Sequence, residues 1–259
     1  MATATSMEER LMGETVASPL MLAGKRLEPA GNGQAAEKLS RSGVGAMPRR
    51  PWQLPEKGLV VFHGGEEAVR LSHYFLPRLL MEGKRVLFLD GANCADPRLM
   101  ARFARERQIA FEQFSRHIQI ARAFTCFQLT ELIERVPRFL AAFPAEALIV
   151  TALPELYFDE DARDWEARVA FEQALASLRR WSQGPSDAGW PAIAVFSAAT
   201  TFTTPPSRHS FFSRLSAAAG EVWRFRLNED RRMGLVCERR AALPGVKEAP
   251  DGPNGCHFS

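Results

Sequence analysis

Short apolar runs alternate along the chain with segments whose apolar residues recur at helical spacing. The runs predict five buried strands, at residues 58–62, 85–90, 117–124, 146–153 and 191–198. The amphipathic segments predict helices at residues 66–82, 97–107, 126–143 and 161–181. Pro137 is expected to kink the third of these helices. Largely apolar strands that alternate with helices are typical of an α/β fold, in which a mostly parallel sheet is covered on both faces.

The pattern changes near the C-terminus, where apolar and basic residues alternate with a period of two. Trp223, Phe225 and Leu227 are separated by Arg224 and Arg226, and the residues NED that follow are typical of a turn. The run MGLVC then resumes as a strand. This arrangement predicts a C-terminal antiparallel β-hairpin with one buried face and one basic face.

The two ends of the chain differ in composition from its middle. Residues 1–50 are rich in Ala, Gly, Ser and Met and contain no aromatic residue, so we expect a disordered tail. Within this tail, residues 7–27 carry apolar side chains near helical spacing and are the segment best suited to fold on a partner. Residues 51–57 are expected to form a Pro-rich linker, residues 58–245 the core domain, and residues 246–259 a second disordered tail.

Composition excludes several classes of function. The 259 residues are 46% hydrophobic and 24% charged, which indicates a globular chain, and a net charge of +3 is too small to argue by itself for nucleic-acid binding. The four cysteines lie far apart, which indicates reduced thiols rather than a zinc site. No apolar run reaches the roughly 18 residues of a membrane span, and the N-terminus lacks a signal-peptide core. We therefore expect a cytoplasmic protein without membrane contact.

The segment VVFHGGEEAVR, at residues 60–70, has the layout of a phosphate-binding loop. An apolar strand enters the pair Gly64 and Gly65, and a helix-like segment follows. In such a layout the free amides at the start of a helix hold an anion. His63 and His73 flank the loop, and as a metal or general-base pair they are a weak candidate. We interpret them as loop and helix-surface residues.

Four strings, taken in their order along the chain, carry a family resemblance. They are RVLFLDGANCADPRLMARFARER at 85–107, IQIARAFTCFQLTELIERV at 118–136, WEARVAFEQALASLRRW at 165–181 and WRFRLNEDRRMGLVCERRAALP at 223–244. With these strings, about three-quarters of the chain resembles the ATPase core of the RecA/RadA recombinase superfamily, in its archaeal–eukaryotic branch. The resemblance implies a RecA-like P-loop NTPase fold.

The resemblance also implies a phosphate loop whose key residues this chain lacks. With Gly64 as the first glycine of the loop, Val69 stands in place of the second. Arg70 replaces the Lys that neutralises phosphate charge, and Leu71 replaces the Ser or Thr that holds Mg²⁺. No Lys occurs between residues 58 and 83, so shifting the alignment does not restore the motif.

Other parts of the hydrolytic site are also altered. Glu66 and Glu67 add negative charge where the loop should attract an anion. Thr151 stands where the fourth strand should end in an acid, and Ala92 stands where the second strand should present a Glu that activates water, although Asp90 is retained. We therefore expect no catalytic residues and no metal, and a degenerate cofactor loop marked by Gly64, Gly65 and Arg70.

In the family, DNA-binding loops follow the fourth and fifth strands. The acidic run at 159–164 follows the fourth; we interpret it as a solvated helix start, and its charge disfavours DNA contact there. After the fifth strand, Arg208 and Arg214 suit phosphate, and three aromatic residues suit unpaired bases: Phe202, Phe211 and Phe212. The alternative is a loop and an amphipathic helix with Phe211 and Phe212 in the core.

The basic face of the hairpin is a denser patch of positive charge. Its arginines are Arg224, Arg226, Arg231, Arg232, Arg239 and Arg240. This patch suits single-stranded DNA or an acidic partner, and the alternative is a solvated face without a ligand.

These observations lead to one main hypothesis and two alternatives. The main hypothesis is a non-catalytic RecA/RadA-like protein that acts as an accessory or scaffold in DNA recombination, repair or damage tolerance. It would bind a repair or recombination protein, and single-stranded DNA, without a cofactor. The linker lacks the Phe-x-x-Ala-type string of family filaments, which favours a monomer or a small hetero-complex. The alternatives are a residual ATPase that binds ATP and Mg²⁺ with Arg70 and Asp90, and an interaction module unrelated to DNA.

Overall fold

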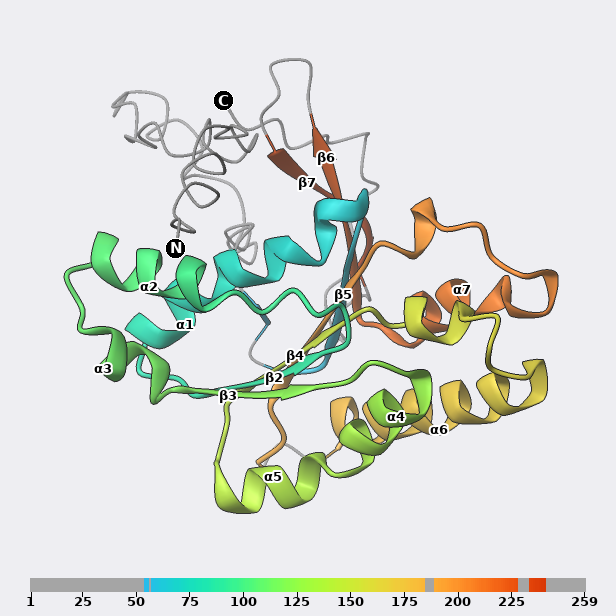
Figure 1. The fold of residues 1–259 in the computed structure, drawn as a ribbon, viewed down its shortest axis with the longest axis horizontal. Coiled ribbons are helices and arrows are strands. Elements are labelled where there is room, and N and C mark those ends of the chain that lie inside the picture. The colour runs from blue at the N-terminus through green and yellow to red at the C-terminus, as the bar shows by residue number, and fades with distance from the viewer. Residues whose placement is uncertain (1–53, 56, 185–188, 228–232, 241–259) are drawn as a thin grey trace, which may run out of the picture. The chain divides into compact units, whose positions relative to one another are not determined.

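The protein core is an α/β domain built on a mostly parallel sheet (Figure 1). The computed structural model describes residues 54–55, 57–184, 189–227 and 233–240. Within them, a seven-stranded sheet has the order β3-β2-β4-β5-β1-β6-β7. The strands are β1 (Leu59–His63), β2 (Val86–Asp90), β3 (Ile118–Arg122), β4 (Ala147–Thr151), β5 (Ala192–Ser197), β6 (Glu221–Leu227) and β7 (Met233–Arg240). The five parallel strands expected from the apolar runs, and the C-terminal hairpin, are all confirmed.

Burial on both faces explains why the central strands are apolar along their whole length. Every residue of β1, β2, β4 and β5 is buried. In β1, Leu59 and Val61 face one hydrophobic core, whereas Val60 and Phe62 face the other. Since successive side chains of a strand point to opposite faces, a strand between two helical layers needs apolar residues at every position.

Helices cover the two faces in separate groups (Figure 1). One face carries α1 (Leu76–Met81), α2 (Pro97–Glu106) and α3 (Phe111–Ser115). The other carries α4 (Cys126–Glu134), α5 (Val136–Ala142), α6 (Asp164–Ser182) and α7 (Ser210–Ala218). In the described connections lie five short 3₁₀ helices: η2 (Glu66–Ala68), η3 (Arg70–Phe75), η4 (Glu155–Phe158), η5 (Ala199–Thr201) and η6 (Pro206–Arg208).

The prediction of one helix at 66–82 is wrong. Two 3₁₀ segments precede α1, which has Pro77 in its first turn. Proline has no backbone N–H and its ring clashes with the preceding turn, so a continuous α-helix cannot pass through this point. Pro137 acts in the same way at the start of α5, where the expected kink is a full break between α4 and α5 at Arg135.

The connections between strands indicate which edge of the sheet is suited to a ligand-binding site. The connections from β1 to β2 and from β2 to β3 run over the face that carries α1 and α2. The connections from β4 to β5 and from β5 to β6 run over the opposite face. The carboxyl ends of β1, β2, β4 and β5 therefore lie where the connections diverge. Ligands of open parallel sheets bind at such a point.

Several sequence predictions lie outside the described residues. These are the two expected tails, most of the linker, and Arg231 and Arg232 of the hairpin turn. In the part of the chain that the structure describes, no helix has the length and apolar character needed to cross a membrane.

Candidate functional site at the carboxyl edge of the sheet

The carboxyl ends of the parallel strands bring five polar residues to one edge. Asp90 at the end of β2 pairs in register with Arg122 of β3 and with Thr151 of β4. His63 at the end of β1 pairs with Ser197 of β5. This is the edge at which the sequence predicts a degenerate nucleotide site.

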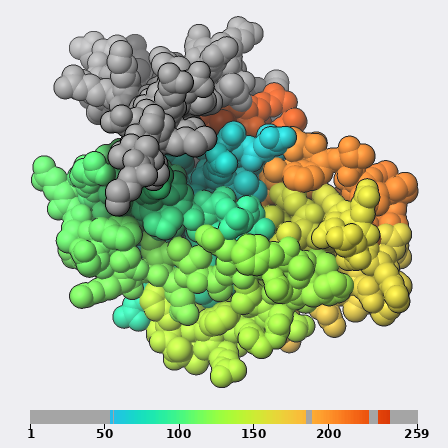
Figure 2. All heavy atoms as spheres, in the orientation of Figure 1, coloured from blue at the N-terminus to red at the C-terminus, as the bar shows by residue number. Residues whose placement is uncertain are grey.

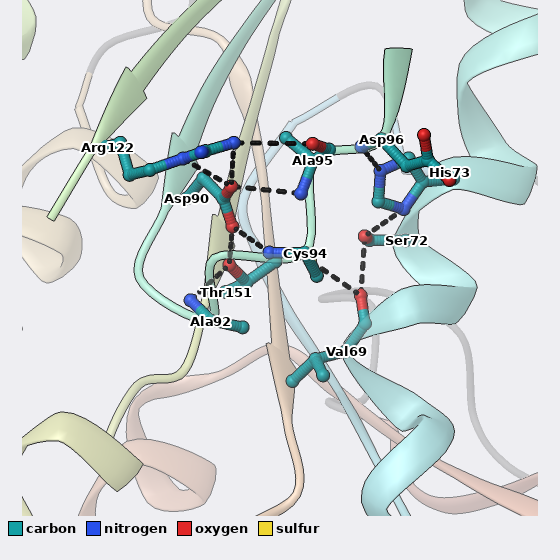
Figure 3. Close-up of polar contacts among 10 residues, drawn as sticks. All are labelled: Val69, Ser72, His73, Asp90, Ala92, Cys94, Ala95, Asp96, Arg122 and Thr151. Carbon is teal, nitrogen blue, oxygen red and sulfur yellow. Dashed lines mark hydrogen bonds and ion pairs between the residues drawn. The ribbon is translucent and has the colours of Figure 1, made fainter. Parts of the chain in front are cut away.

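Asp90 is fully buried, and both of its carboxylate oxygens are already occupied (Figure 3). Oδ1 accepts from the Cys94 amide at 2.9 Å and from the Thr151 hydroxyl at 3.3 Å. Oδ2 accepts from the Ala95 amide at 2.9 Å and from Arg122 Nε at 3.2 Å. A carboxylate has about four acceptor positions. Asp90 therefore anchors the loop after β2 and has no free position for a metal ion or water.

The loop after β2 also closes against the segment after β1. Cys94 Sγ lies 3.7 Å from the carbonyl oxygen of Val69, and the Asp96 amide donates to His73 Nε2 at 3.3 Å. His73 Nδ1 donates to the Arg70 carbonyl at 3.0 Å. With one ring nitrogen donating and the other accepting, His73 is neutral, and its burial lowers its pKa.

The cysteine at this contact is chemically protected. Burial, followed by the charge of Asp90, raises the pKa of Cys94 to about 12. Since the thiolate is the reactive form, Cys94 is an inert packing residue at neutral pH.

The loop between β1 and η3 does not have the geometry of a phosphate nest. Such a nest contains residues in the left-handed region. Among the described residues with positive φ, none lies between 63 and 75, and Gly65 has φ −65° and ψ 179°. A Cβ on Gly64 would lie 3.0 Å from both Cβ and O of Phe225, so glycine at this position permits close packing of β6. A Cβ on Gly65 would meet no atom within 4 Å.

The remaining residues of the predicted loop do not converge on a ligand. Glu66, Glu67 and Arg70 are exposed, while Leu71 is buried in the core beneath α1. The hydroxyl of Thr200, in the loop after β5, donates to the Gly64 carbonyl at 3.1 Å. The loops after β1, β2 and β5 thus contact one another directly at this edge.

The interpretation of both histidines as surface or loop residues is wrong. His63 is 3% exposed and His73 is 0% exposed. The His73 ring lies 5.5 Å from the ring of Phe88 in β2, so it faces the sheet. His63 Nε2 donates to Glu238 Oε2 of β7 at 2.7 Å, and its Nδ1 is buried without a hydrogen-bond partner within the described residues. Arg224 Nη1 lies 3.7 Å from the other oxygen of Glu238.

Glu155 is a buried acid at this edge that sequence reasoning missed. It follows β4 and accepts hydrogen bonds from the Ala198 amide and, at 3.2 Å, from the Ser197 hydroxyl at the end of β5. Burial raises the pKa of Glu155 to about 7. No sequence signal distinguishes Glu155 from the acidic run that begins a few residues later. Its position after an apolar strand and a proline is the only indication.

Arg208 lies inside the fold and not on a DNA-facing surface. The side chain is 2% exposed, and its guanidinium donates to Asp164 Oδ1 and to three backbone carbonyl oxygens, those of Tyr157, Asp159 and Ala162. It therefore holds the acidic run against the start of α6. We do not retain Arg208 in the predicted nucleic-acid surface.

The other predicted nucleic-acid residues that the structure describes are more accessible. Arg214 pairs with Glu172 at the surface, and Arg226 is exposed on β6. Arg224 and Arg240 are each partly neutralised by an acid of the hairpin. Phe211 is buried and stacks on Phe171 at 4.3 Å between centroids, as the core alternative expected, whereas Phe202 is 50% exposed.

Comparison with models of protein families gives no match, and neither does comparison with curated proteins.

Proposed function

We propose that this chain is a RecA/RadA-like protein without ATPase activity that acts as an accessory or scaffold in DNA recombination, repair or damage tolerance. Three features support the RecA-like part of the proposal. They are the four strings along the sequence, the mostly parallel sheet covered on both faces, and the antiparallel β6–β7 pair beside β1. A repair or recombination protein is the proposed partner.

The closed carboxyl edge carries the non-catalytic part of the proposal. In a nucleotide hydrolase this edge must offer free ligands for Mg²⁺ and a cradle for phosphate. Here the Asp90 carboxylate is held by four donors, and the loop at 64–70 presents two exposed glutamates instead of a nest of amides. Nucleotide binding would require these contacts to break.

The first prediction concerns ATP. Purified full-length protein should show no saturable binding of MgATP by isothermal titration calorimetry, no rise in thermal midpoint, and no hydrolysis above background with or without single-stranded DNA. The Arg70→Ala variant should behave identically, because Arg70 is exposed and does not face a loop with the geometry of a phosphate site. A hydrolysis rate that Arg70→Ala abolishes would establish the alternative, a residual ATPase, and contradict the proposal.

The hairpin is the proposed surface for single-stranded DNA. Arg224 and Arg226 share one face of β6, and Arg239 of β7 lies on the same face because it pairs in register with Val222. Arg240 lies over the Trp223 ring on the other face, so it is not part of this surface. Arg239 Nη1 donates to the Ser216 carbonyl at 3.0 Å, which leaves part of its guanidinium for a ligand. Arginines along two strands can contact successive phosphates of one extended strand.

The second prediction tests this surface with a matched control. The double variant Arg224→Gln/Arg226→Gln should weaken binding to labelled oligo-dT and lower the slope of log K against log salt by about 0.7 for each lost phosphate contact. Arg179→Gln/Arg180→Gln, at the exposed end of α6, removes the same charge and should leave the slope unchanged. Equal slopes in wild type and the hairpin variant would remove the hairpin from the proposal.

A further inference from the structure

A hollow between α2 and α3 has features of a peptide-binding site. It measures about 470 Å³ and is lined by Ala101, Ala104, Arg105, Gln108, Ile109 and Phe111. Its walls are mainly apolar, and the Phe111 side chain at its rim is 38% exposed. Both helices lie at the surface, on the left of Figures 1 and 2. The hollow is open to solvent and has room for an apolar side chain of a bound peptide.

Gln108, in the wall of this hollow, has an unfavourable backbone conformation. Its φ is 56°, in the left-handed region. The Ile109 amide donates to the Ala104 carbonyl at 3.0 Å, and the Gln108 amide donates to the Arg105 carbonyl at 3.0 Å, so Gln108 occupies the position that glycine normally takes at a helix end. Such conformations in non-glycine residues concentrate at functional sites. Gln108 therefore lines the hollow with a side-chain amide that can contact a ligand.

The surroundings of the hollow are strongly basic. Residues 97–117 contain five arginines and two glutamates, so this segment has a formal net charge of +3, as large as that of the whole chain. Arg98, Arg102 and Arg105 follow one another at spacings of four and three, so they form one stripe on α2. Arg98 and Arg105 are exposed, and Arg102 lies 3.6 Å from Glu106, with its buried Nε lacking a hydrogen-bond partner among the described residues.

We propose that this surface binds an acidic peptide segment of a partner protein. One apolar side chain of the peptide, of the size of Leu or Phe, occupies the hollow against Ala104 and Phe111. Carboxylates on either side of it face Arg98 and Arg105, and the amide of Gln108 bonds to the peptide backbone. An apolar hollow with charge at its rim is the arrangement typical of protein interfaces, in which the apolar anchor gives affinity and the charges give orientation.

The proposal stands independently of nucleotide or DNA binding. The Arg stripe alone would also suit a phosphate backbone, but a nucleic acid would leave the apolar lining uncovered. Nucleic acid is therefore a competing outcome that the experiment must separate from peptide binding.

The test uses a fluorescein-labelled peptide of about 12 residues, composed of Asp, Glu and Ser with one central Phe. Two control peptides replace either Phe by Ser, or Asp and Glu by Asn and Gln. Titration of ¹⁵N-labelled full-length protein should shift amide signals of residues 98–111 with the first peptide and with neither control. Shifts with the fully polar acidic peptide alone would overturn the role of the hollow.

Variants of the protein complete the test. Arg98→Glu/Arg105→Glu should weaken the peptide about tenfold or more, whereas Arg179→Glu/Arg180→Glu on α6 should change affinity less than twofold. Gln108→Gly should raise the thermal midpoint, because glycine suits φ 56°, yet weaken the peptide about threefold. A Gln108→Gly variant that binds as well as wild type would overturn the assigned role of the amide. Displacement of the peptide by oligo-dT at equal charge would overturn the proposal in favour of nucleic acid.

Discussion

At the residue scale, Glu155 is a buried ionisable group whose raised pKa affects stability in the neutral pH range. It is buried between the loops after β4 and β5, and this burial raises its pKa, whereas the hydrogen bonds from Ala198 and Ser197 lower it only in part. A carboxyl group in such a site favours its neutral form, because the ionised form loses hydration without gaining a cation. The neutral form can still accept the Ala198 amide proton and donate to Ser197.

The third prediction follows from this burial. The pKa of Glu155 is raised from 4.5 to about 7, so the folded state binds more protons than the unfolded state between these values. The contribution of neutral Glu155 to stability is fully present below pH 4.5. As pH rises to about 7 this contribution is lost, and the free energy of unfolding falls by about 3 kcal/mol. Glu155→Gln, which mimics the neutral acid, should remove this loss and should be more stable than wild type at pH 8.

Urea unfolding from pH 5 to pH 8 checks the prediction. Glu66→Gln, at an exposed position of the loop after β1, serves as the control and should keep the wild-type pH dependence. If Glu155→Gln and Glu66→Gln show the same slope of unfolding free energy with pH, Glu155 is ionised in the folded protein and the interpretation of its site is wrong.

Long-range contacts of single residues show which parts of the structure the sequence does not predict. The apolar runs of β1 and β2 predict buried strands, because local composition alone determines whether a strand fits between two helical layers. The pair His63–Glu238 joins residues 175 positions apart, and Glu155 accepts a hydrogen bond from Ala198, just after β5. These contacts depend on the order of strands in the sheet, which the spacing of apolar residues does not encode.

At the element scale, Arg208 connects three segments that the sequence shows as separate. Its guanidinium joins η6 to the carbonyl groups of η4 and of the loop before α6, and it pairs with Asp164 at the first turn of that helix. The acid at the helix start also interacts favourably with the helix dipole. The buried Arg208 thus orients the acidic run at the start of α6. The three other acids of this run are exposed.

The fourth prediction compares two arginines of neighbouring elements. Arg208→Ala should lower the unfolding free energy by roughly 3 kcal/mol or more, because it leaves several buried carbonyl groups unpaired. Arg214→Ala, which breaks an exposed ion pair with Glu172, should cost less than about 1 kcal/mol. Thermal and urea unfolding measure both. An Arg208→Ala variant with wild-type stability but weakened oligo-dT binding would restore the original prediction of a DNA contact.

At the scale of the whole domain, the β6–β7 hairpin is part of the core and not an appendage. Phe225 of β6 and Leu235 of β7 are buried in the same cluster as β1 and α1. The Phe225 ring lies 6.0 Å from that of Phe62 and 6.4 Å from that of Phe196. The hairpin therefore contributes two apolar side chains to the core that lies between the sheet and α1.

The fifth prediction is that the domain unfolds with its hairpin in one transition. Phe225→Ala should lower the unfolding free energy by about 3–5 kcal/mol and leave a single cooperative transition by both circular dichroism and Trp fluorescence. Arg226→Ala, an exposed neighbour on the same strand, should change it by less than about 0.5 kcal/mol. Two separate transitions, with only the minor one affected by Phe225→Ala, would show that the hairpin folds apart from the sheet.

The central place of β1 in the sheet has a consequence for synthesis of the chain. β1 lies between β5 and β6, and Leu59 pairs with Ile193, about 130 residues later. At roughly 5–20 residues per second, a ribosome needs roughly 7–26 s to produce the partners of this strand after it has emerged. During that interval the apolar run LVVF has no neighbour in the sheet, and an unpaired apolar strand is a template for association with other chains. The yield of folded protein in a cell is therefore expected to depend on chaperones that cover nascent chains.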